Sequence, residues 1–180
     1  MLRGELVNLR AVDRHDAELI YRWLNNPDIM RYWGIPSSTP SLTETQRQIE
    51  DWLDQEGRLG RPACLIIETL EAEVIGFVSF GEYKADSRSM ELSLLIGEPD
   101  WWGRGIGTDV LQTVIATCFD DWNLRRLWAR AEAFNERAHR LFKRCGFVHE
   151  ATLRDASYFE GQYHHILVFG LLASDETGSD

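Results

Sequence analysis

Three glycines at alternate positions form the stretch of the sequence that is best suited to bind a ligand. Gly103, Gly105 and Gly107 are interrupted by Arg104 and a single apolar residue. Because glycine has no Cβ atom, a phosphate can approach the backbone N–H groups of such a stretch closely. Arg104 adds a cationic side chain at the same place. The stretch therefore predicts a site for a pyrophosphate group.

The elements on either side of the glycines support this prediction. Apolar residues alternate with others over residues 90–96, which is the period of a strand, and Pro99 ends the run. From Thr108 onward, apolar residues recur at spacings of three and four as far as Phe119, which predicts a helix. The glycines thus lie at a helix N-terminus, where unpaired N–H groups and the helix dipole attract anions.

The spacing of the glycines decides among the known phosphate-binding patterns. The dinucleotide pattern G-x-G-x-x-G needs a third glycine where the chain has Thr108, and the Walker pattern needs a Gly-Lys pair, which the sequence lacks. By contrast, residues 102–107 resemble the Q/R-x-x-G-x-G/A motif of the GCN5-related N-acetyltransferases (GNAT), with Trp102 in place of the leading Gln or Arg. The resemblance implies that this loop holds the pyrophosphate of coenzyme A.

A second segment supports the same family. Residues 135–147 are similar to the family's N-x-x-A-x-x-L-Y-x-x-x-G-F segment, with Phe142 at the position of the tyrosine. The resemblance extends over residues 5–172. The closing hairpin, with its turn at Gly161, looks most like the ribosomal-protein N-terminal acetyltransferase (RimJ/RimL) branch.

Hydrophobic periodicity divides the chain into alternating strands and helices of an α+β domain. The order β-α-α-β-β-β-α-β-α-β-β combines antiparallel hairpins with one parallel βαβ unit. For the sheet, the resemblance implies six to seven mostly antiparallel strands with helices on both faces, and a splay between the fourth and fifth strands. The predicted strands are residues 5–12, 63–69, 74–80, 91–96, 126–134, 148–158 and 163–172.

Length and composition bound the remaining organisation. The 180 residues suit one domain over residues 1–173, and the acidic end, residues 174–180, is expected to be a disordered tail. No leader or membrane span is recognisable, so a soluble, cytoplasmic protein is expected. A net charge of −10 argues against nucleic acid or a membrane as a partner and suits a cationic substrate, although acidity also serves solubility.

Cysteine and histidine spacing argues against a metal site. Cys64, Cys118 and Cys145 form no C-x-x-C pair, which predicts buried, reduced thiols. The five histidines show no H-E-x-x-H spacing, so no metal is expected. Trp101 and Trp102 beside the glycines either cover the loop or form the interface of a homodimer.

The resemblance also implies how acetyl-CoA, the acetyl donor, is held. Backbone N–H groups of the strand before the loop bind the acetyl carbonyl and the pantetheine arm. Asn135 resembles a family residue that bonds the cofactor, although Asn at this position also suits a helix N-cap. The expected cofactor-binding residues are Leu94, Leu95, Ile96, Trp102, Gly103, Arg104, Gly105, Ile106, Gly107, Thr108, Asn135 and Phe142.

The candidate catalytic residues are Glu91 and Ser93. Glu91 matches the family's frequent strand glutamate, which takes the amine proton directly or through water, and Ser93 on the same strand face can hold that water. The alternative reading is a strand residue that is solvated or ion-paired next to Arg88. Glu132, on the neighbouring strand, is a weaker candidate for the base.

The general acid is where the sequence departs from the family. The family tyrosine protonates the leaving thiolate in many members, and the phenyl ring of Phe142 cannot. Water, Tyr158, Tyr163 or His164 would have to supply the proton. Otherwise the chain is an acyl-CoA-binding module without efficient turnover.

The acceptor follows from the cost of deprotonating an amine. A lysine-type amine costs about 4–5 kcal/mol to deprotonate at neutral pH, whereas an α-amino group costs about 1 kcal/mol. A site without a strong acid–base pair favours the α-amino group of a protein N-terminus or of a small molecule. The acidic helix expected after Ser41 suits a different acceptor, a polycation such as an aminoglycoside or a polyamine.

Overall fold

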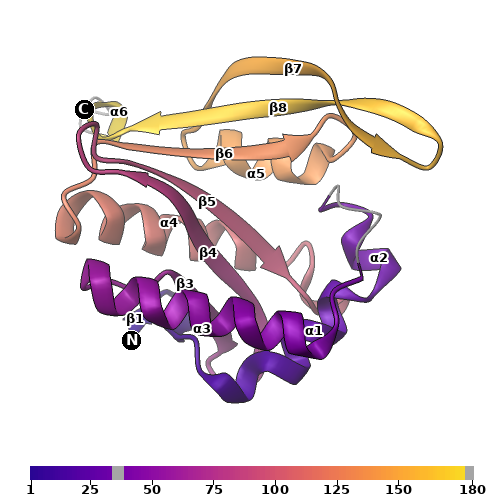
Figure 1. The fold of residues 1–180 in the computed structure, drawn as a ribbon. Helices are drawn as coiled ribbons and strands as arrows, with labels where there is room; N and C mark the ends of the chain where they lie inside the picture. Colours follow the sequence, from indigo (N-terminus) through magenta and orange to yellow (C-terminus); the bar gives the residue numbers. More distant parts are fainter. Residues whose placement is uncertain (34–38, 177–180) are drawn as a thin grey trace.

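The computed structural model describes residues 1–33 and 39–176, and it shows an open sheet flanked by helices (Figure 1). The strand order is β1-β2-β3-β4-β5-β6-β8-β7, and every neighbouring pair is antiparallel except β5 and β6. The strands are β1 (Leu2–Arg3), β2 (Val7–Ala11), β3 (Cys64–Thr69), β4 (Val74–Lys84), β5 (Ser89–Ile96), β6 (Arg126–Glu132), β7 (Val148–Phe159) and β8 (Gln162–Leu172).

The predicted α+β class and the mixed, mostly antiparallel sheet are confirmed, with one difference in strand number. The sheet has eight strands rather than six or seven. The additional strand, β1, consists of two residues that pair with β2. Two residues are too few to show a hydrophobic period, so this strand has no signature in the sequence.

Helices cover both faces of the sheet, as expected (Figure 1). Side chains of α4 and α5 pack into one core, and side chains of α1, α2 and α3 pack into the core on the other face. The helices are α1 (Ala17–Leu24), α2 (Pro27–Met30), α3 (Leu42–Leu59), α4 (Ile106–Ala116), α5 (Glu136–Arg144) and α6 (Ala173–Glu176).

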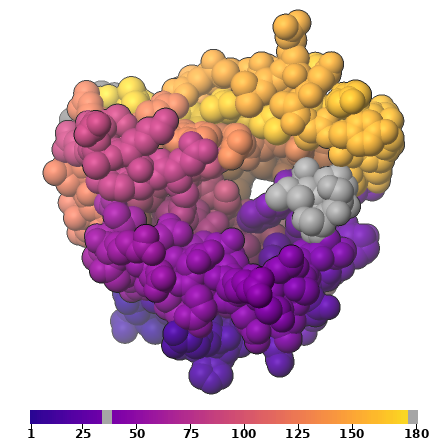
Figure 2. Space-filling model, in the orientation of Figure 1, coloured from indigo at the N-terminus to yellow at the C-terminus, as the bar shows by residue number. Residues whose placement is uncertain are grey.

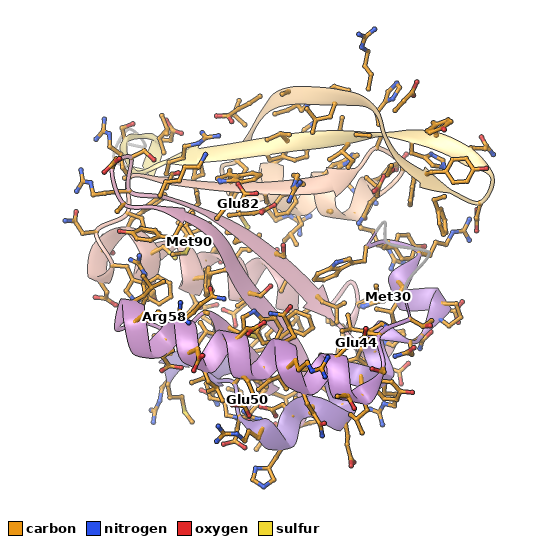
Figure 3. The ribbon with its side chains drawn as sticks, in the orientation of Figure 1. Met30, Glu44, Glu50, Arg58, Glu82 and Met90 are labelled. Atoms are coloured by element: carbon orange, nitrogen blue, oxygen red, sulfur yellow. The ribbon has the colours of Figure 1, made fainter. Side chains whose placement is uncertain are left out.

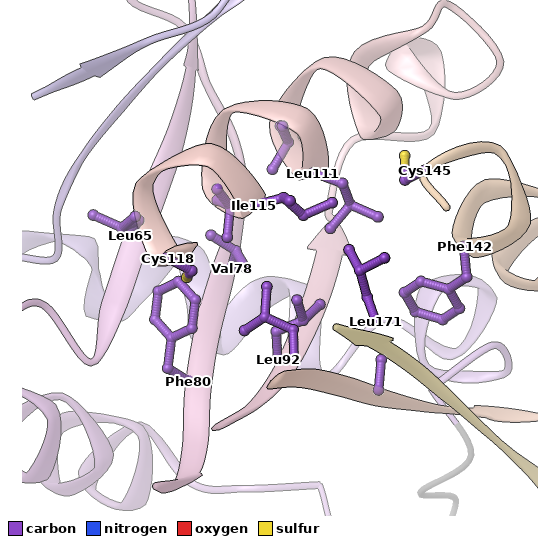
Figure 4. Close-up of a cluster of buried hydrophobic side chains, with 14 of the residues drawn as sticks. Leu65, Val78, Phe80, Leu92, Leu111, Ile115, Cys118, Phe142, Cys145 and Leu171 are labelled. Atoms are coloured by element: carbon purple, nitrogen blue, oxygen red, sulfur yellow. The ribbon is translucent and has the colours of Figure 1, made fainter. Parts of the chain in front are cut away.

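Alternation along β5 sends its side chains to these two cores. Met90 and Leu92 point toward α4, whereas Leu95 points toward α1 and α3. Figure 4 shows the first core, in which Leu92 lies among side chains of β3, β4, α4 and α5. The three cysteines are free and buried, as predicted, and burial raises the pKa of each thiol.

One carboxylate fastens the N-terminal strand to α4. Asp109, in the first turn of α4, accepts backbone hydrogen bonds from Glu5, Leu6 and Val7 at 2.8, 2.9 and 3.1 Å. A Cβ atom on Gly4 would lie within 2.9 Å of this carboxylate, so only glycine leaves room for it. Asp109, just after the glycine loop, therefore also fixes the backbone that leads into β2.

The expected splay between two strands is present and separates β5 from β6. The parallel ladder pairs only three residues of each strand and ends at Glu91 and Trp128. Beyond this point β5 stays paired with β4 up to Ile96, while β6 stays paired with β8 up to Glu132. The last residues of β5 therefore have no strand partner on the β6 side.

The C-terminal end departs from the expected disordered tail of residues 174–180. Residues Ala173–Glu176 form helix α6, and residues 177–180 lie outside the described part. The backbone N–H of Ala173 donates to Arg125, and Asp175 accepts from the N–H of Leu172, so the chain remains tied to the sheet. Residues 34–38, within the predicted loop, also lie outside the described part. In the described residues, no helix is long and apolar enough to cross a membrane.

Candidate active site

A cavity of about 440 Å³ lies at the splay, between the end of β5, the glycine loop, the start of α4, α5 and the segment after α2. It brings together all the expected cofactor-binding residues except Arg104 and Phe142. Residues far apart in the sequence therefore surround one space. The surface is hollowed between the purple N-terminal helices and the orange and yellow C-terminal strands (Figure 2).

The glycine loop has the backbone conformation that its composition predicts. Gly103 and Gly105 have φ angles of 75° and 86°, in the left-handed region that side chains disfavour. Gly105 is the N-cap of α4, and the N–H groups of Ile106 and Gly107, which line the cavity, come before the first intrahelical bond, from the Thr108 N–H to the Gly105 carbonyl. A Cβ atom on Gly107 would lie 3.1 Å from Leu141, so glycine here lets α4 and α5 approach closely.

Trp102, which stands in place of the family's Gln or Arg, closes the loop onto β5. Its indole N–H donates to the carbonyl of Ile96 at 2.9 Å. Its ring forms a T-shaped pair with Tyr32, and the guanidinium of Arg137 lies over the ring at 4.8 Å from the centroid. Trp102 therefore anchors the loop, and it lines the cavity rather than supplying a charge.

The cations of the cavity come from α5, not from Arg104. Arg104 lies over the ring of Trp101 at 5.1 Å and does not line the cavity. Arg137, Arg140 and Arg144 line it instead, and sequence analysis missed all three. Their spacing of three and four residues did mark one helical face, but only the fold shows what that face borders.

Asn135 has the N-cap role that its residue type suggests. Its Oδ1 accepts from the N–H of Ala138 at 3.1 Å at the start of α5. Its Nδ2 donates to the carbonyl of Tyr32 at 3.0 Å and so connects α5 to the segment after α2. Asn135 also lines the cavity, so capping and a contact with a bound cofactor are compatible.

Phe142 does not lie where the resemblance to the family tyrosine implies. It is 5% exposed and packs against Phe147 and Phe169 in the core. The neighbouring residues Ala138 and Leu141 occupy the cavity side of α5 instead. An apolar ring gains more from burial in the core than from a position at a polar site, which explains the difference.

Glu91 and Ser93 lie on the face of β5 opposite to Leu94 and Ile96, because successive side chains alternate. The Glu91 side chain is 11% exposed and forms a bidentate ion pair with Arg130, at 2.7 Å to Nε and 3.2 Å to Nη2. The suggested alternative partner, Arg88, instead donates to Asn123. Glu91 is therefore ion-paired, with a partner on β6 that sequence reasoning did not name.

A second buried carboxylate, Glu132, lies further along β6. It is 5% exposed, and its Oε2 accepts from the hydroxyl of Ser157 on β7 at 2.6 Å. Glu132 and Arg130 are two residues apart on β6, so their side chains share one face of the sheet. Within residues 1–33 and 39–176, Glu132 forms no ion pair.

The proton donors suggested from the closing hairpin do not reach the cavity. Tyr158 and Tyr163 are 56% and 68% exposed and pack against each other. His164 packs against Phe134 and Phe159. None of the three lines the cavity, whereas Tyr32 does.

The cavity suits acetyl-CoA in size and in charge. Its volume is in the range of small-molecule sites, about 300–1,000 Å³. Its lining combines the N-terminus of α4, three arginines of α5 and the last residues of β5, which have no strand partner on the β6 side. No carboxylate is among the described residues that line it, although the chain has a net charge of −10. In the described part of the chain, no group of three or more His, Cys, Asp or Glu is arranged to hold a metal.

Known proteins share this sequence and this fold. A family model described as an acetyltransferase (GNAT) domain matches residues 7–148. The chain is 25% identical over 168 residues to the spermidine N(1)-acetyltransferase of Vibrio cholerae, which covers 93% of this chain and 94% of that relative. It is 27% identical over 161 residues to the aminoglycoside N(6')-acetyltransferase type 1 of Klebsiella pneumoniae, covering 83% and 78% of the two chains.

A solved structure has the same fold. The crystal structure of the spermidine N-acetyltransferase from Vibrio cholerae in complex with CoA and spermine superposes with a TM-score of 0.86. The match covers 97% of this chain and 100% of the other, with 24% sequence identity. The chain therefore belongs to the GNAT acetyltransferase family and is an acyltransferase that transfers an acetyl group from acetyl-CoA to an amine.

Proposed function

We propose that the acceptor is a primary amine of a small polycation of the polyamine or aminoglycoside class. The observation that carries the proposal is Glu132, a buried carboxylate without an ion pair in the described part of the chain. A buried charge is costly unless a group of opposite charge compensates it. An ammonium group of a polycation, bound against the face of β6 that carries Glu132, would supply that charge.

The acidic helix α3 supports the same class of acceptor. One edge of α3 carries the carboxylates of Glu44 and Asp51 and the neutral amide of Gln55, at spacings of seven and four. Glu44 also accepts from the Ser41 N–H in the helix cap. Gln55 and Gly81 line the same small pocket. Gly81 in turn is close to Glu91, because a Cβ atom placed on Gly81 would lie 4.0 Å from Glu91 Oε2. This edge of α3 therefore faces the Glu91 side of the sheet. Glu50 lies on the lower side of α3 in Figure 3, where it binds Arg14 instead.

Glu91 and Ser93 are proposed to remove the amine proton. Both carboxylate oxygens of Glu91 accept from Arg130, which fixes the orientation of the group. Each carboxylate oxygen has further acceptor capacity, so a water held by Ser93 can pass the amine proton to Glu91. Acetyl-CoA, when bound, supplies the reactive thioester, and the unpaired end of β5 offers N–H groups that orient its carbonyl.

The acceptor class is tested by following thiol release from acetyl-CoA. The panel holds polyamines, aminoglycosides and peptides with free N-termini. We expect kcat/KM for the best polycation to exceed that of the best peptide by at least about tenfold, and to fall as salt rises, because ionic attraction is screened. A preference for peptides would assign the α-amino acceptor of the RimJ/RimL branch instead. Acetyl-CoA binding without turnover of any panel member would contradict the polycation assignment and place the acceptor outside the tested classes.

Replacing Glu132 with Gln tests the residue that carries the proposal. Glu132→Gln keeps an acceptor for the Ser157 hydroxyl but removes the charge, so we expect KM for a polyamine to rise about tenfold. The measurement is steady-state kinetics at saturating acetyl-CoA. Glu71→Gln, in the exposed β3–β4 turn, is the matched control and should leave KM unchanged. Unchanged KM in both variants would contradict an ammonium site at Glu132.

Tyr32 is proposed as the donor that protonates the leaving thiolate, because it is the tyrosine among the described residues that line the cavity. Tyr32→Phe keeps the ring contact with Trp102 and removes the hydroxyl. We expect kcat to fall about tenfold while the Kd of acetyl-CoA stays constant. This fall is smaller than the usual effect of removing a general acid, because a thiolate is a fair leaving group. Tyr158→Phe, on the exposed hairpin, is the control. A weaker affinity for acetyl-CoA without a lower kcat would show that Tyr32 has only a packing role.

A further inference from the structure

The face of α5 that borders the cavity carries an unusual concentration of positive charge. Arg137, Arg140 and Arg144 all line the cavity, and no carboxylate is among its described lining residues. They lie at successive turns of one helix face. The chain as a whole has a net charge of −10. Three guanidinium groups on one wall therefore indicate a ligand with several negative charges.

The three arginines differ in the contacts that their side chains already make. Arg137 lies over the rings of Tyr32 and Trp102, at 5.6 and 4.8 Å from the centroids, and this holds it near the glycine loop. Arg140 forms an ion pair with Glu136 at 3.0 Å, with side chains 64% and 76% exposed, and such exposed pairs are weak. Arg144 forms no ion pair within residues 1–33 and 39–176. Arg140 and Arg144 are thus available to a ligand.

The number and position of these cations exceed what a pyrophosphate requires. The glycine loop and the first turn of α4 already offer backbone N–H groups to a pyrophosphate. Arg144 lies about 10 Å along the helix axis from Arg137, at a rise of about 1.5 Å per residue. Two further arginines along α5 therefore match a phosphate that is separate from the pyrophosphate. Coenzyme A carries such a group, the phosphate monoester on the 3′ oxygen of its ribose.

We propose that Arg140 and Arg144 bind the 3′-phosphate of acetyl-CoA, so that the protein discriminates coenzyme A from its 3′-dephospho form. A phosphate monoester carries about −1.5 to −2 charges near neutral pH, and guanidinium groups bind it through charge-assisted hydrogen bonds. The inference rests on the acetyl-CoA part of the function and is independent of the acceptor. In this proposal, α5 is the element that selects the acetyl donor by its 3′-phosphate.

The test compares the binding of CoA and of 3′-dephospho-CoA by calorimetry, in the absence of any acceptor. We expect the unmodified protein to bind CoA about tenfold more tightly, a modest ratio because both arginines are exposed. Arg140→Gln and Arg144→Gln should each reduce this ratio, and the double variant should abolish it. Lys143→Gln removes a charge from an exposed position next to Arg144 that does not line the cavity. It should keep the full ratio.

Two results would overturn the proposal. Equal affinities of the unmodified protein for the two ligands would show that the 3′-phosphate is not recognised. Equal weakening of both ligands in Arg140→Gln and Arg144→Gln would place these arginines on the pyrophosphate instead. Thermal unfolding of each variant verifies that the fold is intact. Because no acceptor is present, failure to find an amine substrate would leave these results unaffected.

Discussion

Glu91→Gln is expected to lower kcat for amine acetylation by about 100-fold at pH 7 and by less than about tenfold near pH 10. At pH 7 a primary amine with an ordinary pKa near 10.4 is almost entirely protonated, so the reaction needs a base. A positioned base typically contributes about 10²–10⁴-fold. Near pH 10 much of the amine is already neutral, and the base contributes less. The measurement is the initial rate of thiol release across pH at saturating acetyl-CoA.

A structural role of Glu91 would produce a different result. The carboxylate holds Arg130 through two hydrogen bonds between β5 and β6, so its loss could also disturb the splay. In that case the rate would fall equally at both pH values, and the Kd of acetyl-CoA would rise as well. Arg130→Gln is the matched variant, because it breaks the same ion pair but leaves the carboxylate in place. It should retain the wild-type pH dependence of the rate, although its absolute rate is lower.

Asp109→Ala is expected to destabilise the fold by about 2–4 kcal/mol. The buried Asp109 carboxylate accepts hydrogen bonds from three successive backbone N–H groups, those of Glu5, Leu6 and Val7. Alanine would leave these donors without their partner at the start of β2. The loss at the buried Val7 costs about 1–3 kcal/mol, whereas Glu5 and Leu6 are exposed and their N–H groups can bond water at a smaller cost. For a protein of this size the Tm should fall by about 10 °C.

Two further variants separate this contact from a general effect of charge. Asp109→Asn keeps one carbonyl oxygen as an acceptor and should show an intermediate loss of stability. Asp120→Ala removes a carboxylate at an exposed position beyond α4 and should change the stability by less than about 0.5 kcal/mol. Chemical denaturation measures all three variants. Equal effects of Asp109→Ala and Asp120→Ala would contradict the role of the three hydrogen bonds.

The features that sequence analysis predicted correctly depend on residues close together in the chain. The strand before the glycines, the helix after them and the left-handed glycines follow from spacings of two, three and four residues. Asn135 is a second example, because an N-cap contacts the backbone only three residues later. Such information is local, so it is present in the sequence before any tertiary contact forms.

The features that it missed depend on residues that are distant in the chain. Glu91 meets Arg130, which is 39 positions later, because β5 and β6 begin as a parallel pair, and no periodicity indicates that partner. Asp109 meets Glu5 across 104 positions. The hydrogen bond between Asn135 and Tyr32 spans 103 positions and places a tyrosine beside the cavity.

The sequence by itself determined that the chain has an anion-binding loop at the start of a helix, within an α+β acetyltransferase fold. Only the tertiary structure decided which charges accompany the loop. Arg104 is next to the glycines in sequence, yet it lies over Trp101, whereas the distant arginines of α5 line the cavity. The reason is that a side chain's neighbours are set by how helices pack on the sheet. That packing is determined by burial of the whole apolar surface rather than by any single motif.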